Sequence, residues 1–358
     1  MEPGYNSSMQ ALQIASNVSL TPYSTMRLGG KAAYATAVSS RQELAAAHQW
    51  ATERQLPLLV IGSGSNIVWR DEGFPGLLVI NKIMQFEAFN EDDTNTYVTI
   101  GAGENWDSAV ARCVDMGLTG IEALSLIPGT AGATPVQNVG AYGQEIAQTL
   151  SSLEAYDTVE KRFLNIASQD CDFGYRSSRF KTTDRSRYLI SAITLHLTKG
   201  NPQPPFYNAL QGYLSEHNIT DYTPQTIRQA VIAIRSAKLP DPTTVANNGS
   251  FFANPIVSEA AFTQILADFP NAPHWPASDK PGETNVKLPA AWLVEQAGFK
   301  DMHDAETGMA TWAKQPLVLV NEHATSTAQL LAFKKKITDA VQAKFAITLE
   351  QEPELLPQ

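Results

Sequence analysis

The feature that most constrains this chain is a glycine-rich and nearly uncharged stretch, PGTAGATPVQNVGAYG, at positions 128–143. Its sixteen residues include four glycines, three alanines and two prolines. Such a segment buries little apolar surface and makes a poor strand. Because glycine lets the backbone approach a ligand closely and turn its N–H groups toward it, the stretch predicts a binding loop.

Two more loops of this kind precede it. Gly62-Ser63-Gly64-Ser65-Asn66 interrupts the apolar run at 56–69, and Gly101-Ala102-Gly103 follows the strand-like YVTI. Three small, uncharged loops after strand-like runs indicate a cradle for an anionic group, such as the pyrophosphate of a dinucleotide cofactor. The Rossmann fingerprint is not met, because Ile67 stands where its third glycine belongs, and the Walker lysine is also absent.

The spacing of apolar residues predicts two helices. The first begins at Trp106 and is stopped by Gly117, and its apolar stripe continues through Ala109, Val110, Cys113 and Val114. The second spans 327–345, with a solvated lysine run at 334–336 and an apolar face formed by Leu330, Ile337, Val341 and Phe345. The polar, proline-rich tract at 269–287 predicts a long surface loop in which His274 is exposed.

Composition excludes several classes of protein. The chain of 358 residues has a formal net charge of −10 and is 43% hydrophobic, so we expect a globular core and no field that attracts nucleic acid or anionic membranes. The first ten residues lack a signal-peptide pattern, and no apolar run approaches the ~20 residues of a membrane span. Two cysteines without a CxxC spacing favour a reduced, cytoplasmic protein, and no obligatory protein partner is evident.

Several motifs together carry a family resemblance. In order, they are VIGSGSN, GAGENW, LIPGTAGATPVQNVGAYG, CDFGYRSSRFK, RSAKLPDP, NNGSFFANP and LPAAWLVEQAGFK. This order resembles that of the bacterial UDP-N-acetylenolpyruvoylglucosamine reductases over about 25–352. The PPFYNAL segment resembles the longer, type I branch of that family.

The resemblance implies an α+β flavoprotein in three regions. Two of them would hold FAD in a vanillyl-alcohol-oxidase-like (PCMH-type) fold, and a C-terminal α+β domain would bind the substrate. The expected bounds are 16–83 and 84–239 for the FAD-binding regions and 240–345 for the substrate domain, with the tail 346–358 packing back on the first region.

The resemblance also implies an activity. An enzyme of this family is an FAD-containing, NADP-dependent oxidoreductase that uses NADPH to reduce UDP-N-acetylglucosamine enolpyruvate to UDP-N-acetylmuramate, in peptidoglycan precursor synthesis. The glycine-rich loops would hold FAD, and in the stretch 128–143 larger side chains would keep the cofactor out. The implied cofactor-binding residues are Gly62, Ser63, Gly64, Ser65, Asn66, Gly129, Thr134, Gln137 and Asn138, the last two as partners of the flavin ring.

Three residues match the catalytic positions of the family. Arg176 supplies a planar cation for a developing enolate, and Ser250 matches the proton donor. A glutamate near the end completes the set. Alignment of the ending LEQE favours Glu352, but Pro353 interrupts the usual pattern, so Glu350 and Glu354 stay open. The expected substrate contacts are Tyr175, Tyr207, Lys238, Asn254 and Gln315, with no metal.

Two other interpretations fit a chain of this kind. One is another flavin oxidoreductase of the same fold, although the early loops between His48 and His196 offer no histidine for covalent flavin attachment. The other is a nucleotide-sugar-binding protein without turnover. The presence of Arg176, Ser250 and a terminal glutamate counts against it.

Overall fold

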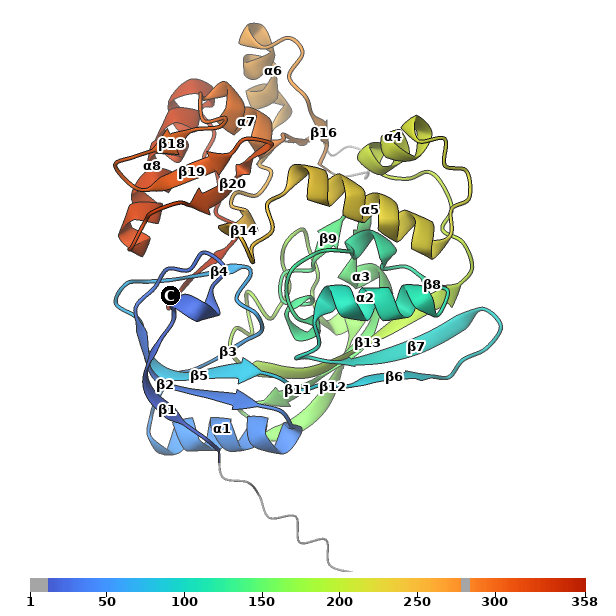
Figure 1. The fold of residues 1–358 in the computed structure, drawn as a ribbon, viewed down its shortest axis with the longest axis vertical. Helices are drawn as coiled ribbons and strands as arrows, with labels where there is room; N and C mark the ends of the chain where they lie inside the picture. The colour runs from blue at the N-terminus through green and yellow to red at the C-terminus, as the bar shows by residue number, and fades with distance from the viewer. Residues whose placement is uncertain (1–11, 278–283) are drawn as a thin grey trace, which may run out of the picture.

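The first region is a small sheet backed by one helix. The computed structural model describes residues 12–277 and 284–358. The first ten residues, which lack a signal-peptide pattern, lie outside the described residues. Three parallel strands and one antiparallel edge strand form the order β1-β2-β5-β3, and α1 lies against one face (Figure 1). The elements are β1 (Ala15–Ser19), β2 (Lys31–Val38), α1 (Arg41–Glu53), β3 (Leu58–Ile61), β4 (Ile67–Trp69) and β5 (Phe74–Asn81).

The second region is built on an antiparallel sheet. Its order is β12-β11-β13-β7-β6, and β8 pairs with β13 outside this path. Its strands are β6 (Phe86–Phe89), β7 (Asn95–Gly101), β8 (Leu118–Thr119), β9 (Gly140–Ala141), β10 (Gln144–Glu145), β11 (Leu150–Asp157), β12 (Arg162–Ala167) and β13 (Tyr188–Lys199). Its helices are α2 (Trp106–Asp115), α3 (Ile146–Thr149), α4 (Asn208–Glu216) and α5 (Pro224–Lys238).

The predicted helix after the second glycine loop is confirmed as α2. Asn105 caps it by accepting a hydrogen bond from the Ser108 N–H group, and all five residues of the predicted apolar stripe are buried. Gly117, with φ of +73°, follows its end in the left-handed conformation typical of a helix C-terminus. The helix fixes the loop at 101–105 at one end of the sheet.

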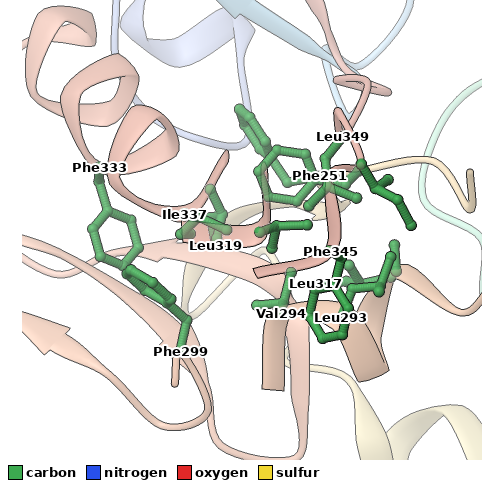
Figure 2. Close-up of a cluster of buried hydrophobic side chains, with 14 of the residues drawn as sticks. Phe251, Leu293, Val294, Phe299, Leu317, Leu319, Phe333, Ile337, Phe345 and Leu349 are labelled. Carbon is green, nitrogen blue, oxygen red and sulfur yellow. The ribbon is translucent and has the colours of Figure 1, made fainter. Parts of the chain in front are cut away.

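The third region packs helices on a second antiparallel sheet. The order is β14-β20-β19-β18, and a small sheet, β15-β17-β16, lies beside it. Figure 2 shows the buried side chains between this sheet and its helices, among them Phe251, Leu319 and Ile337. The elements are β14 (Ala246–Ser250), β15 (Ile256–Val257), α6 (Glu259–Asp268), β16 (Trp275–Pro276), β17 (Val286–Lys287), α7 (Ala290–Gln296), β18 (His303–Asp304), β19 (Met309–Trp312), β20 (Gln315–Asn321), α8 (Thr327–Phe345) and β21 (Glu354–Leu356).

The C-terminal helix is confirmed, but its lysine run is not simply solvated. Helix α8 spans Thr327–Phe345 as predicted, with the apolar stripe buried. Lys336 pairs with Asp304 and Glu306 at 2.8 and 2.6 Å, and Lys334 donates to Gln351 at 2.9 Å. Lys335 is solvated as predicted, with its side chain 73% exposed. The partners of Lys334 and Lys336 were missed because a run of three lysines cannot reveal which acidic or amide groups the neighbouring segments bring.

The proline-rich tract at 269–287 is also more ordered than a surface loop. Trp275 and Pro276 form β16, which pairs with β17 at the end of the tract. His274 is exposed, as expected, and packs on Phe262. Residues 278–283 of this tract lie outside the described residues.

The C-terminal tail connects the third region to the first. The Glu352 N–H group donates a hydrogen bond to Phe251 O, and Gln351 and Phe252 form an isolated antiparallel β-bridge. The next residues form β21, which pairs in parallel with β4, so the chain ends beside the first region (Figure 1). These contacts of the tail place Glu352 next to the segment that follows β14, the strand that ends at Ser250. None of the helices formed by residues 12–277 and 284–358 has the length and apolar character needed to cross a membrane.

Candidate active site

All three regions and the tail contribute to one cavity of about 420 Å³. This is within the ~300–1,000 Å³ typical of small-molecule and cofactor sites. The cavity lining includes thirteen of the residues expected in the site: Gly62, Ser63, Gly64, Ser65, Asn66, Gly129, Thr134, Gln137, Tyr175, Arg176, Ser250, Asn254 and Glu352. It also includes Glu354, one of the two alternative glutamates.

The first and third glycine loops pack against their neighbours as well as facing the cavity. Gly64 has a φ of +73°, and a Cβ there would collide with the Tyr23 carbonyl oxygen. A Cβ at Gly62 would collide with the Thr130 hydroxyl. At Gly129 a Cβ would meet just Ser65 Oγ, at 3.4 Å, so glycine is favoured there by its φ of +144° and not by a packing conflict. Loop packing therefore requires glycine at positions 62 and 64.

The amides of the first loop suit an anion. Within the described residues, the N–H groups from Ser63 to Asn66 donate to no protein acceptor. The loop is held open by Ser65 Oγ, which donates to Pro128 O at 2.9 Å, and by Asn66 Nδ2, which donates to Gln137 Oε1 at 2.6 Å. N–H groups without a protein acceptor on an uncharged, cavity-lining loop are donors that a pyrophosphate can use, so these residues fit FAD.

Arg176 and Glu352 form a partly buried ion pair in the cavity wall. Arg176 Nε donates to Glu352 Oε1 at 3.0 Å, and Arg176 Nη2 donates to Gly140 O at 3.0 Å. The two side chains are 25% and 14% exposed. Arg176 has a φ of +52°, a strained conformation for a residue with a side chain, and such strain gathers at functional sites.

The geometry separates the three terminal glutamates. Glu350 is exposed, and Glu354 pairs with Arg185 at 2.8 Å, whereas Glu352 contacts Arg176. We therefore keep Glu352 as the proposed catalytic carboxylate. The three glutamates do not share one strand. Strand β21 begins only at Glu354, after Pro353.

Burial raises the pKa of Glu352, and the neighbouring Arg176 lowers it only in part. The folded protein therefore holds this proton more tightly than the unfolded chain does. The stability that this group contributes is fully present below its ordinary pKa of 4.5 and is lost as the pH rises through the raised value.

This sign predicts a difference between wild type and Glu352→Gln, which cannot ionise. As the pH rises from 4.5 to 7.5, the free energy of unfolding of the wild type should fall relative to that of the variant. Urea denaturation of both proteins at the two pH values measures the difference. Parallel changes would show that Arg176 offsets the effect of burial completely.

Ser250 ends β14 and lies in the wall that it shares with Phe252. Within the described residues no protein group hydrogen-bonds its hydroxyl, which is free to face a ligand. Phe251, between them, is fully buried in the core of the third region (Figure 2). Because successive side chains of an extended segment point to opposite sides, Phe251 anchors the strand in the core and Ser250 faces the cavity.

Four residues expected in the site do not line the cavity. The Asn138 amide donates to Glu145 and Gly174 O and accepts from the Ala147 N–H group, so we no longer assign its side chain to the flavin ring. Tyr207 stacks edge-on against Tyr142 and is 47% exposed. Lys238 is exposed at the end of α5, and Gln315 begins β20.

Sequence reasoning missed Arg235. This residue of α5 lines the cavity, and its Nε atom is buried without a protein partner in the part of the chain that the structure describes. Burial lowers the pKa of its guanidinium group, and the adjacent Tyr142 hydroxyl opposes that shift. The pattern offered a clue, because Arg235 falls four residues after Val231 on the buried stripe of the helix, where a charge is unexpected.

Two family models match the chain in succession. An FAD binding domain matches residues 32–160, and the C-terminal domain of UDP-N-acetylenolpyruvoylglucosamine reductase matches residues 241–356. Together they confirm the expected α+β arrangement of an FAD-binding part followed by a C-terminal domain.

Relatives and a solved structure agree with these models. The reductase of that name from Ralstonia nicotianae is 40% identical over 92% of this chain and 96% of its own. The one from Thermobifida fusca is 40% identical over 96% of this chain and 98% of its own. The crystal structure of UDP-N-acetylenolpyruvylglucosamine reductase from Thermus caldophilus, 20% identical, shares the fold over 97% of this chain and all of its own, with a TM-score of 0.65. The chain belongs to the UDP-N-acetylenolpyruvoylglucosamine reductase family.

Proposed function

We propose that this protein reduces UDP-N-acetylglucosamine enolpyruvate to UDP-N-acetylmuramate, with FAD as cofactor and NADPH as reductant. The observation that carries the proposal is the shared cavity, in which Arg176, Glu352 and Ser250 face the loops that fit FAD. The reaction adds a hydride to the methylene carbon of the enolpyruvyl group and a proton to the neighbouring carbon. When bound, FAD supplies the hydride, which it receives from NADPH.

Arg176 stabilises the charge that develops during this reduction. Hydride addition leaves negative charge on the carbon next to the substrate carboxylate and on the carboxylate itself. Glu352 and Gly140 O occupy two of the five donors of the guanidinium group, so three stay available for the substrate. The same two contacts hold the Arg176 fork in place before the substrate arrives, which is what electrostatic stabilisation requires.

Ser250 gives the proton from its Oγ atom to the carbon next to the carboxylate. A serine hydroxyl is a weak acid, so it can donate only to a strongly basic carbanion in a site that stabilises the alkoxide left behind. Arg176, whose guanidinium group lines the same cavity, favours that step because its positive charge stabilises the negative charge left behind. Solvent then restores the serine proton.

Arg235 holds an anionic part of the UDP-sugar in this proposal. An arginine Nε that is buried without a protein partner is costly unless a ligand pairs with it. Tyr207, Lys238 and Gln315 lie outside the cavity wall, and we propose that they meet the outer part of the same ligand.

Replacing Arg235 by methionine should raise KM for the UDP-sugar by about 10- to 100-fold, while reduction by NADPH continues at the wild-type rate. Arg228→Met is the matched control, because Arg228 lies on the same helix and pairs with Asp107 at 2.6 Å outside the cavity. The control should lose stability and keep its KM. Equal KM values in all three proteins would exclude Arg235 from substrate binding.

An anaerobic titration tests the proposed reaction. The purified protein should bind FAD and turn yellow, and NADPH alone should bleach the flavin bands. Addition of the enolpyruvyl UDP-sugar should then restore the colour without oxygen, and UDP-N-acetylmuramate should form in equal amount. Return of the colour only with oxygen would instead indicate an oxidase.

We also propose that the enzyme works in the cytoplasm without an obligatory protein partner. Cys113 and Cys171 are both buried free thiols, as is usual in a reducing compartment. Gel filtration at several protein concentrations, combined with activity measurements, would reveal any dependence on assembly.

A further inference from the structure

We propose that Asn248 binds FAD directly, through its side-chain oxygen, and thereby fixes Ser250 relative to the cofactor. Asn248 lies on β14, two residues before Ser250, and both residues line the cavity. Its side chain is almost completely buried, at 5% exposure. The inference rests on the proposed function only in taking FAD as the occupant of the cavity.

The hydrogen-bond network sets the orientation of the Asn248 amide. Its Nδ2 atom lies 3.2 Å from Ser65 O, 3.2 Å from Ile67 O and 3.0 Å from Thr25 Oγ1. Two of these partners are backbone carbonyls, which can only accept hydrogen bonds. The reversed amide would place an oxygen against both carbonyls, so the nitrogen faces the first region and Oδ1 is turned away from it.

The Asn248 oxygen has no partner of its own. Oδ1 is buried, and it accepts no hydrogen bond from the part of the chain that the structure describes. A buried polar atom without a partner is rare in native proteins and calls for an explanation. Because Oδ1 belongs to a cavity-lining residue and can only accept, a ligand that completes it must present an N–H or O–H group.

The position of Asn248 favours the cofactor as that ligand. The same amide is bonded to Ser65 O and Ile67 O, at the loop whose free N–H groups fit the pyrophosphate. Ser250, on the other side, belongs to the reacting end of the site. The donors that FAD would offer to Oδ1 are the imide N–H group of its ring and its ribityl hydroxyls. Asn248 thus ties the strand of the proposed proton donor both to the cofactor loop and to the cofactor.

The affinity for FAD tests this assignment. Full-length protein freed of flavin is titrated with FAD, and the quenching of flavin fluorescence gives Kd. Asn248→Ala should weaken FAD binding about tenfold, the effect of one lost hydrogen bond, and should shift the visible absorption bands of the bound flavin. Asn248→Ser removes the amide oxygen and keeps one O–H donor at this position, so it should show the same loss with less damage to folding.

Asn247→Ala is the matched control. Asn247 is 3% exposed on the same strand, and its amide bonds only to Val245 O and the Gly249 N–H group, away from the cavity. This control should keep the wild-type Kd and flavin spectrum. Equal weakening by Asn247→Ala, or an unchanged Kd for FAD together with weaker binding of the UDP-sugar, would overturn the inference. Failure of the wild type to bind FAD would overturn the proposed function itself.

Discussion

Replacing Ser250 by alanine should slow the transfer to the enolpyruvyl substrate by about 10²- to 10⁴-fold while reduction by NADPH stays at the wild-type rate. The reason is that the Ser250 hydroxyl is the proposed source of the proton, which is needed only after hydride has reached the substrate. Stopped-flow absorbance at the flavin bands measures both half-reactions in one protein, so the first half-reaction is the internal control.

The structure makes this variant a clean one. Phe251 anchors the strand in the core, and the Ser250 side chain makes no hydrogen bond within the described residues, so its removal should cost little stability. Two results would contradict the assignment. Equal losses in both half-reactions would mean that Ser250 positions the cofactor, and no loss in either would mean that another group supplies the proton.

Replacing Glu352 by glutamine should lower turnover by about 10²-fold or more, through the second half-reaction. Glu352 Oε1 accepts from Arg176 Nε at 3.0 Å in a largely buried wall, so the loss of its charge leaves the guanidinium group less firmly oriented. The uncompensated cation should also bind the substrate carboxylate more tightly in the ground state. We therefore expect kcat to fall while KM stays the same or decreases.

Glu350→Gln provides the matched control for this prediction. Glu350 lies two residues earlier in the same tail and is exposed, so the variant should turn over at the wild-type rate. Glu354 and its partner Arg185 also line the cavity, but Glu354 does not pair with Arg176, so Glu354→Gln should lose less activity than Glu352→Gln. If Glu350→Gln or Glu354→Gln lost as much activity as Glu352→Gln, the proposed position of the catalytic carboxylate in the tail would be wrong.

Local patterns were sufficient to predict several elements of this fold. The stripe from Trp106 to Val114 predicted α2, and the repeat from Leu330 to Phe345 predicted α8, because a buried helix face repeats every 3.6 residues. The glycine loops and the motif around Ser250 were also recognisable, because each is a short continuous segment of the sequence.

Contacts between distant segments could not be predicted in this way. Gly62 and Gly64 have no room for a side chain, because Thr130 lies against the first and Tyr23 against the second. Neither partner is near in sequence. The roles proposed for Arg235 and Asn248 depend on side-chain atoms that the fold leaves without partners, and the sequence alone cannot show which atoms those are. Conversely, Asn138 matched a binding motif, yet its amide is occupied within its own loop and by Gly174 O.

A crystal structure of the protein with FAD and the enolpyruvyl UDP-sugar, grown without NADPH, tests the central claim most directly. The claim predicts that the flavin ring lies between the loop of Gly129 and the strand of Ser250. The Ser250 hydroxyl should be within ~3.5 Å of the carbon to be protonated, and the substrate carboxylate should lie on Arg176. A flavin bound outside this cavity, or a vinyl group out of reach of Ser250 and Arg176, would contradict it.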